Sequence, residues 1–196
     1  MIDTSLITQL RSATGAGIVD CKEALTESAN NLEKAIEILR KKGQSSMAKR
    51  MGRVAREGVV TSYIHGAKIG VLLELLCETD FVARTEDFQN LAKDLSMHIA
   101  ASAPVYVKAE DIPTTVIEKE KEIYREQLKA EGKPENMFEK IMEGKLKRFA
   151  EEQCLIEQVY YRDETKKVKD VIAEVIAKTG EKIEVGRFVR FVLGST

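Results

Sequence analysis

The chain of 196 residues contains no tryptophan, only three prolines, and few cysteines and histidines. With so few prolines and no tryptophan, the composition favours a helix-rich domain over a sandwich of many strands. The net charge is only -1 although charged residues make up 32% of the chain, so no overall charge draws the protein to nucleic acid or to a membrane. Any binding must therefore depend on a local surface.

The three cysteines, Cys21, Cys77 and Cys154, are an odd number at wide spacing, and the histidines are only His65 and His98. This pattern contains no Cys-x-x-Cys pair and excludes both a disulfide framework and a zinc site, so we expect no metal and no cofactor. The sequence also lacks an apolar run of the roughly 20 residues that a membrane span needs, and its N-terminus lacks the basic flank of a signal peptide. We therefore predict a soluble cytoplasmic protein without a membrane partner.

Residues 1–43 are predicted to form three short helices, because apolar residues recur at helical spacing in three separate stretches. These apolar positions are Leu6, Ile7 and Leu10; Ile18, Cys21 and Leu25; and Leu32, Ala35, Ile36 and Leu39. Asn30 or Asn31 is expected to cap the third helix, and Gly43 to end it. So small a bundle supplies only a few kcal/mol of stability by itself.

A turn with two glycines, Gly15 and Gly17, separates the first two of these helices and allows the backbone to bend sharply and to approach a partner closely. Ile18 and Val19 follow as adjacent apolar residues, and neighbours on a helix point about 100° apart. We therefore expect one of the two to be exposed as an apolar contact for a partner. The alternative is a loose bundle that buries both.

The segment that follows the three helices is basic, with lysines and arginines between Lys41 and Arg56 and no acid among them. Because no aromatic residues are interleaved with these charges, we favour a solvated linker helix over residues 44–57 and not a nucleic-acid-binding surface. Gly52 weakens this helix by about 1 kcal/mol relative to alanine, which suits a joint between two domains.

Two β-rich runs, Val59–Ile64 and Ile69–Cys77, flank a short turn and predict a β-hairpin. A helix follows, and its apolar residues recur at the spacing that would pack it on the hairpin. These residues are Phe88, Leu91, Leu95 and Ile99, with Thr85 or Asp87 as the cap. Asp80 and Phe81 thus lie at a strand-to-helix corner, where a rigid scaffold commonly displays functional side chains. The alternative is that Asp80 caps the helix and Phe81 belongs to the core.

The rest of the chain predicts two charged antiparallel helices over residues 115–130 and 135–152, then a helix over 168–178 and a strand over 183–193. The inward positions of the third helix are Val168, Ile172, Val175 and Ile176, and Gly180 ends it. The predicted fold class is α+β. Its order is an N-terminal three-helix domain (1–43), the linker helix (44–57), a core domain of an antiparallel sheet with packed helices (58–164), and a C-terminal helix-strand module (165–196).

Two stretches resemble one known family. Residues 78–84, Glu-Thr-Asp-Phe-Val-Ala-Arg, resemble the signature loop of translation elongation factor Ts, and residues 10–25 closely resemble the N-terminal signature of that family. Residues 144–158 and the C-terminal end are similar to the family as well. The resemblance implies a three-helix domain similar to ubiquitin-associated domains, and a function as a guanine-nucleotide exchange factor that helps elongation factor Tu release GDP.

The resemblance also implies the residues that would bind elongation factor Tu. In the family, the ring that matches Phe81 wedges between two helices of the nucleotide domain of Tu, and the acid that matches Asp80 acts near its Mg²⁺ network. The predicted binding residues of this loop are Thr79, Asp80, Phe81 and Val82, and those of the N-terminal domain are Arg11, Gly15, Gly17, Ile18 and Val19. The partner would be bound in its GDP-bound and nucleotide-free states, without covalent chemistry.

Longer members of the family carry a second core subdomain and a protruding coiled coil, for which this chain has no room. The short form pairs in the family as a homodimer whose two sheets pack together. The apolar strand around residues 188–193 fits that implication, because an exposed apolar face favours association.

Three other functions compete with this interpretation. An enzyme is disfavoured because Cys77 lies in an apolar run and His98 is not paired with a nucleophile at motif spacing. An adaptor or ubiquitin-associated-like interaction module built on residues 3–43 is permitted by the fold alone. A role of the basic linker on the ribosome or on RNA is the third, and it would show a strong dependence on salt.

Overall fold

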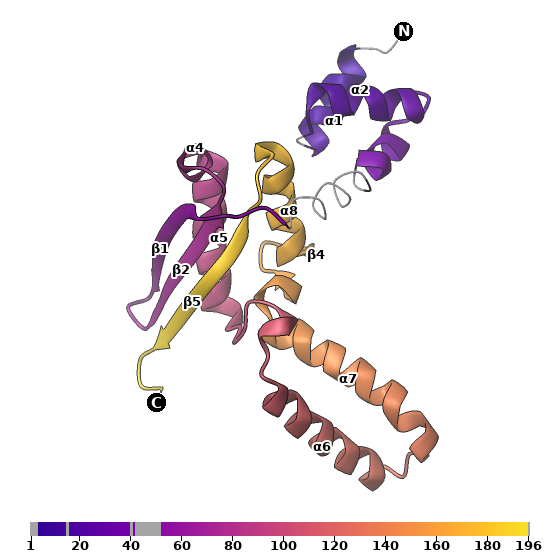
Figure 1. Ribbon diagram of the computed structural model, residues 1–196, viewed down its shortest axis with the longest axis vertical. Helices are drawn as coiled ribbons and strands as arrows, with labels where there is room; N and C mark the ends of the chain where they lie inside the picture. The colour runs from indigo at the N-terminus through magenta and orange to yellow at the C-terminus, as the bar shows by residue number, and fades with distance from the viewer. Residues whose placement is uncertain (1–3, 15, 40, 42–51, 196) are drawn as a thin grey trace. The chain divides into compact units, whose positions relative to one another are not determined.

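The computed structural model describes residues 4–14, 16–39, 41 and 52–195, and it combines helices with an antiparallel sheet, so the predicted α+β class is confirmed (Figure 1). Two compact units can be distinguished. The first comprises residues 1–61, 73–94 and 170–186, and the second comprises residues 62–72, 95–169 and 187–196. The boundaries predicted from the sequence stay a prediction.

The N-terminal segment contains the three predicted helices: α1 (Thr4–Thr14), α2 (Ile18–Glu27) and a third that includes residues 32–39 and 41. Asn31 caps the third helix, because its Oδ1 accepts a hydrogen bond from the Lys34 amide at 3.0 Å. The buried core consists of Leu10, Cys21, Ala24, Leu25, Ala35 and Leu39. Of the apolar stripe predicted for the second helix, Cys21 and Leu25 are buried, whereas Ile18 is exposed.

Much of the predicted linker helix over residues 44–57 lies outside the described residues. For the residues that the structure does describe, the prediction of a helix was wrong. Residues 52–56 are not helical, and strand β1 begins at Glu57. Ala55 is buried, and the Arg53 guanidinium contacts the Glu78 carboxylate at 3.4 Å. These contacts favour an extended chain that leads into β1, whereas the local composition predicted a helix.

The sheet has three strands in the order β1-β2-β5: β1 (Glu57–His65), β2 (Ile69–Cys77) and β5 (Glu184–Val192). The predicted hairpin is confirmed, since β1 and β2 are joined by a tight turn in which the Lys68 amide donates to the His65 carbonyl at 3.0 Å. Gly66 and Ala67 both have positive φ, 54° and 56°, as the two central residues of a hairpin turn of type I′ require.

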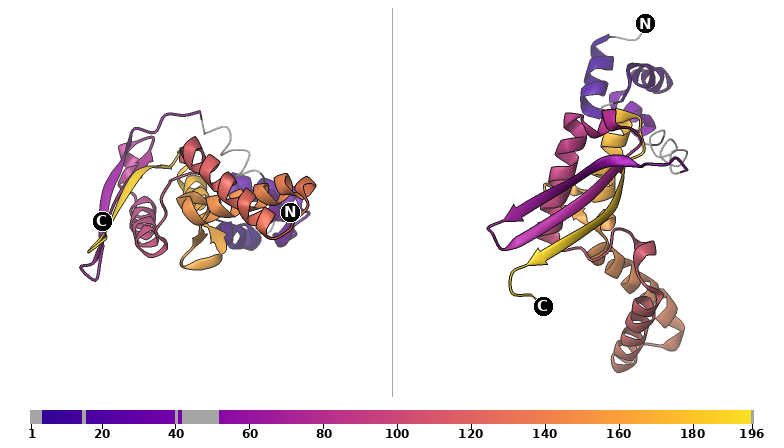
Figure 2. Two further views of the ribbon diagram at one scale, coloured as in Figure 1. Left: turned by 90° about the horizontal axis from the view of Figure 1, so that it is seen from below. Right: turned by 60° about the vertical axis from the view of Figure 1, so that its left-hand side comes forward.

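Helix α5 (Glu86–Ser102) lies along one face of the sheet, as Figure 2 shows in the view from below. The four apolar residues predicted to pack it are all buried: Phe88, Leu91, Leu95 and Ile99. Thr85 is the cap, because its Oγ1 accepts from the Phe88 amide at 3.4 Å. At the other end, the Arg190 guanidinium of β5 donates two hydrogen bonds to the Ala100 carbonyl, at 3.2 and 3.0 Å. These bonds supply a partner to a carbonyl that the end of the helix leaves open.

The two charged helices are α6 (Thr114–Ala130) and α7 (Phe138–Gln153), with the short 3-10 helices η1 (Ala109–Asp111), η2 (Glu135–Met137) and η3 (Leu155–Glu157) around them. They pack against each other, and the Lys145 ammonium lies 5.1 Å from the centre of the Tyr124 ring. The two charged antiparallel helices predicted over residues 115–130 and 135–152 are therefore confirmed.

A second, two-stranded sheet was missed by the sequence analysis. Strand β3 (Val159–Tyr160) pairs antiparallel with β4 (Asp163–Lys167). The sequence of β4, Asp-Glu-Thr-Lys-Lys, has no apolar alternation, so no local pattern marks it as a strand. Tyr106 forms an isolated parallel bridge to Cys154.

Helix α8 (Val168–Thr179) and the strand after it match the prediction. The four inward residues, Val168, Ile172, Val175 and Ile176, are buried, and Gly180 has a φ of 75° just after the helix ends. Among the residues that the structure describes, no helix has both the length and the apolar character needed to cross a membrane.

His98 of α5 is fully buried and hydrogen-bonded as a neutral imidazole. The Gln158 amide nitrogen donates to the carbonyls of Ser102 and Glu152, so the Gln158 Oε1, 2.9 Å from the His98 Nε2, must accept from the ring. The His98 Nδ1 then accepts from the Tyr161 amide at 3.4 Å. Burial lowers the pKa of His98 below its ordinary value, because protonation would place an uncompensated charge in the interior.

We expect this histidine to make the protein less stable in acid. Because the folded-state pKa of His98 is lower than the ordinary 6.5, the unfolded chain binds more protons as the pH falls below about 6.5. The free energy of unfolding should therefore drop by up to about 1.4 kcal/mol for each pH unit in that window. Urea unfolding at pH 7.5 and 5.5 should show a smaller drop for His98→Gln than for the wild type. His65→Gln, at an exposed histidine, is the control; an unchanged drop in His98→Gln would contradict this account.

Candidate functional site

The corner between β2 and α5 carries the short helix α4 (Asp80–Ala83). Thr79 is its cap: the residue is extended, with φ -130° and ψ 155°, and its Oγ1 accepts from the Val82 amide at 3.4 Å. The alternative in which Asp80 caps the helix is therefore wrong. Asp80 is instead the first residue of the helix, and the predicted strand-to-helix corner is present (Figure 1).

Phe81 projects into solvent from this corner, with 80% of its surface exposed. Its neighbours Val82 and Ala83 are buried, at 9% and 5%, and they hold the helix against the core. The alternative in which Phe81 belongs to the core is therefore wrong. An exposed phenylalanine gains free energy only when another surface covers it. The structure places Val82 among the residues that support the corner, and not on its surface.

Asp80 forms an ion pair with Arg84, the residue that follows α4. The Arg84 guanidinium lies 2.9 Å from the Asp80 carboxylate, and half of the Asp80 side chain and 80% of that of Arg84 are exposed. Exposed ion pairs of this kind contribute between about 0 and 1 kcal/mol. The pair can therefore open at little cost, and the Asp80 carboxylate is available to a cation or a donor on a bound surface.

A carboxylate from the distant end of the chain is hydrogen-bonded to the corner. The Glu181 side chain accepts from the amides of Glu78 and Thr79, at 3.1 and 3.0 Å, and from the Thr79 hydroxyl at 2.6 Å. In the other direction, the Glu78 carboxylate accepts from the Lys182 amide at 2.7 Å. Glu181 is not predictable from the sequence, because no local pattern connects two residues about a hundred positions apart.

The predicted N-terminal residues lie partly around one hollow. Arg11 and Ile18 line a hollow of about 490 Å³ together with Thr4, Ile7, Thr8 and Ser12. Ile18 and Val19 are both exposed, at 56% and 69%, whereas we had expected one of them to be buried. The reason is that both lie in the first turn of α2, ahead of the residues that fill the core. This segment therefore offers two apolar side chains beside one cation.

Of the two glycines of the N-terminal turn, the structure describes Gly17. Gly17 has φ -61° and ψ 153°, an extended conformation that any residue can adopt. A Cβ there would lie 3.2 Å from the Asp20 carboxylate, a close contact that a small shift of this exposed side chain can relieve. Gly15 lies outside the described residues.

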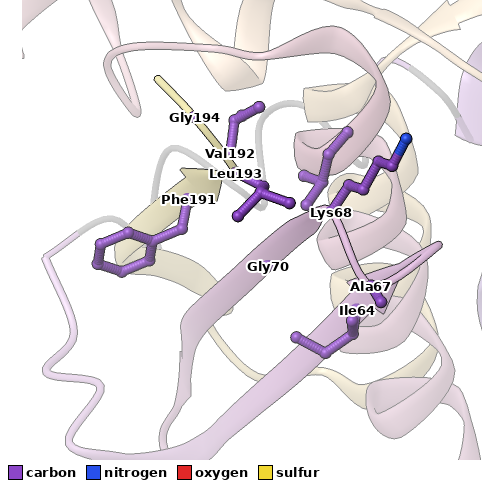
Figure 3. Close-up of a pocket in the computed structure, with 9 residues that line it drawn as sticks. Ile64, Ala67, Lys68, Gly70, Phe191, Val192, Leu193 and Gly194 are labelled. Carbon is purple, nitrogen blue, oxygen red and sulfur yellow. The ribbon is translucent and has the colours of Figure 1, made fainter. Parts of the chain in front are cut away.

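An apolar surface covers the end of the sheet in the second unit. From Phe188 to Val192, β5 alternates between half-buried and exposed residues, and Val189, Phe191 and Leu193 are exposed at 41%, 67% and 75%. Phe191 and Leu193 line a hollow of about 380 Å³ that reaches Ile64 and Gly70 (Figure 3). We call Ile64, Leu72, Val189, Phe191 and Leu193 the apolar sheet face; all five are exposed.

The three cysteines do not suit nucleophilic chemistry. All three cysteines are free and buried. Burial raises the pKa of the Cys21 thiol. It raises the pKa of the Cys77 thiol, which lies next to Glu181, to about 11, and the pKa of the Cys154 thiol also to about 11. They are therefore protonated at neutral pH and are poor nucleophiles. In the described part of the chain, no three His, Cys, Asp or Glu side chains form a group that could hold a metal ion. The exposed ring and charges suit binding to another protein.

Comparison with known proteins shows one consistent relationship. A profile of the family described as Elongation factor TS matches residues 5–195. A protein of Thermosipho melanesiensis named Elongation factor Ts is 57% identical over 195 residues, 99% of this chain and 100% of the relative. That of Thermotoga maritima is 57% identical over 194 residues, 98% of this chain and 96% of the relative. That of Thermodesulfovibrio yellowstonii is 55% identical over 195 residues, 100% of this chain and 98% of the relative.

Proposed function

This chain belongs to the elongation factor Ts family, and we propose that it is the guanine-nucleotide exchange factor of a cytoplasmic elongation factor Tu. The observation that carries the proposal is Phe81, an aromatic ring with 80% of its surface exposed at a corner where the next two residues, Val82 and Ala83, are buried. The proposed activity consists of binding, with no covalent step and no cofactor of its own.

The proposed mechanism follows from what holds GDP in a GTPase. Backbone amides, a lysine and a Mg²⁺ ion stabilise the phosphate charge, so the nucleotide leaves slowly. A protein that binds the nucleotide-free conformation more tightly than the GDP-bound one must weaken GDP binding by the same factor. We propose that this chain binds both states and prefers the nucleotide-free one.

In this proposal Phe81 enters the nucleotide domain of Tu, and Asp80 acts next to the Mg²⁺ network, released from Arg84. Burial of one phenylalanine contributes about 1.5–3 kcal/mol, whereas a ten-thousandfold weakening of GDP requires about 5.5 kcal/mol of coupling. Several contacts must therefore act together. The exposed Ile18 and Val19, with Arg11, are the candidates for a second contact on the same domain.

The proposal is tested by the release of mant-GDP from elongation factor Tu, followed by stopped flow with and without this protein at several Mg²⁺ concentrations. We expect faster release in its presence, and a smaller acceleration at low Mg²⁺, because part of the barrier has then already been removed. If the protein binds Tu without changing the rate of release, it is an interaction module and not an exchange factor.

We also propose that two copies associate through the apolar sheet face. Five exposed apolar side chains on one face would cost free energy in water, and a second copy offers the same surface with two-fold symmetry. The apolar sheet face and the Phe81 corner have no residue in common.

Phe191→Asp is expected to weaken this dimer by more than about 100-fold. Two-fold symmetry places the new charge at the interface twice, and a buried unpaired carboxylate costs several kcal/mol. Sedimentation equilibrium over a range of concentrations would measure the dissociation constant. Val105→Asp is the matched control, because Val105 is 58% exposed but is not part of the apolar sheet face. Equal dimerisation of Phe191→Asp and the wild type would refute this interface.

A further inference from the structure

We propose that Glu181 is a positioning residue that holds the corner in the conformation that presents Phe81. The inference rests on the proposed exchange function and adds to it a residue that does not itself touch the partner. The four-residue helix α4 is too short to be stable by itself, because helix nucleation is unfavourable. The conformation of Phe81, its second residue, must therefore be maintained by contacts from outside the helix.

Glu181 supplies such contacts with both of its carboxylate oxygens. Its Oε2 accepts from the amides of Glu78 and Thr79, the two residues between the end of β2 and the start of α4, at 3.1 and 3.0 Å. Its Oε1 accepts from the Thr79 hydroxyl at 2.6 Å. Hydrogen bonds to an ionised carboxylate are about twice as strong as neutral ones.

The Thr79 hydroxyl transmits this constraint to α4. While its proton is donated to Glu181, its oxygen accepts from the Val82 amide at 3.4 Å and so caps the first turn of the helix. The Cys77 thiol, 3.1 Å from the Thr79 carbonyl, fixes the same residue from the strand side. Without Glu181, the hydroxyl is free to rotate away from the cap, and Phe81 samples more orientations.

The loop that carries Glu181 is itself held in place. Gly180 turns the chain after α8 with a φ of 75°, a conformation that favours glycine. Lys182 returns a hydrogen bond to the corner through its amide, which donates to the Glu78 carboxylate at 2.7 Å. The Lys178 ammonium at the end of α8 lies 2.9 Å from the Asp87 carboxylate of α5. The loop is therefore held in place at several points, and these contacts fix the position of the Glu181 carboxylate.

The first test compares exchange activity across substitutions at position 181. Glu181→Ala should lower the second-order rate constant of mant-GDP release by about tenfold, and Glu181→Gln, which keeps the size and one acceptor, by about threefold. Glu164→Gln is the matched control for the change of charge, since Glu164 is exposed on β4, and it should behave as the wild type. Equal activity of Glu181→Ala and the wild type would overturn the inference.

The second test asks whether Glu181 acts through Phe81. In a Phe81→Ala background, Glu181→Ala should lower the rate constant by less than about twofold, because the side chain that it positions is gone. If the tenfold loss persists in that background, Glu181 contributes by another route and the inference is wrong.

The third test does not depend on exchange activity, so it separates this inference from the proposed function. Amide hydrogen exchange at Glu78, Thr79 and Val82 should be at least about tenfold faster in Glu181→Ala, with the amides of α5 unchanged. If Glu181→Ala fails to fold, Glu181→Gln is the deciding variant, and about threefold faster exchange at the same amides is expected. Unchanged protection would overturn the inference even if the wild type releases GDP; altered protection with no GDP release would leave it standing and refute the exchange function.

Discussion

Phe81→Ala is expected to weaken binding to nucleotide-free elongation factor Tu by about 2–4 kcal/mol, a loss of about 30- to 1000-fold in affinity. The reason is that Phe81 is the large apolar side chain most exposed at the corner, while its neighbours are buried and held by the core. Removal of the ring should leave the fold intact, because an exposed side chain contributes little to stability.

The measurement is mant-GDP release at limiting and at saturating concentrations of the variant. A loss only at limiting concentrations means that Phe81 contributes to affinity alone; a loss that persists at saturation means that it also contributes to coupling. Met137→Ala is the matched control, because Met137 is another exposed apolar residue, at 47%, on the short helix before α7. If Phe81→Ala releases GDP as fast as the wild type under both conditions, the wedge mechanism is refuted.

Gly58→Ala is expected to destabilise the protein by about 3–5 kcal/mol. Gly58, in β1, has a φ of 148°, which side-chain-bearing residues rarely adopt. A Cβ at this position would lie 2.1 Å from the Leu75 carbonyl oxygen and 2.9 Å from the Leu76 Cα. Both atoms belong to the backbone of β2, so the clash can be relieved only by moving the strand that leads to the corner.

The expected result is a melting temperature lower by roughly 10 °C, measured by circular dichroism. Gly66→Ala is the matched control, because Gly66 also has a positive φ, 54°, but nothing lies within 4 Å of its Cβ position. That substitution should cost only about 1–2 kcal/mol. If the two substitutions cost the same, backbone strain alone explains both, and the close approach of β1 to β2 has no energetic effect.

The corner itself was largely predictable from local sequence. The apolar run Ile69–Cys77 has the length and composition of a buried strand, and β2 begins and ends at those two residues. Helix α5 was predictable for the same reason, because Phe88, Leu91, Leu95 and Ile99 repeat at helical spacing and are all buried. Each of these elements spans fewer than about twenty residues, so the spacing of apolar residues along the sequence is enough to predict it.

Exposure was predicted less well, because it depends on how much space a core offers. Ile18 has the helical spacing of a core residue with Cys21 and Leu25, yet the small N-terminal interior is full without it. The linker shows the same limit: its basic residues suggested a helix, while the contact of Arg53 with Glu78 and the burial of Ala55 favour an extended chain.

The sequence by itself determined the α+β class, the hairpin and the helix that packs on it, and it showed the resemblance to elongation factor Ts. Each of these follows from short-range patterns of residues or from short motifs. Only the tertiary structure decided that Phe81 faces solvent, that Val82 does not, and that Glu181 bonds to the amides of Glu78 and Thr79. The physical reason is that exposure and hydrogen bonding across about a hundred residues arise when distant segments pack, and no local periodicity encodes which segments will meet.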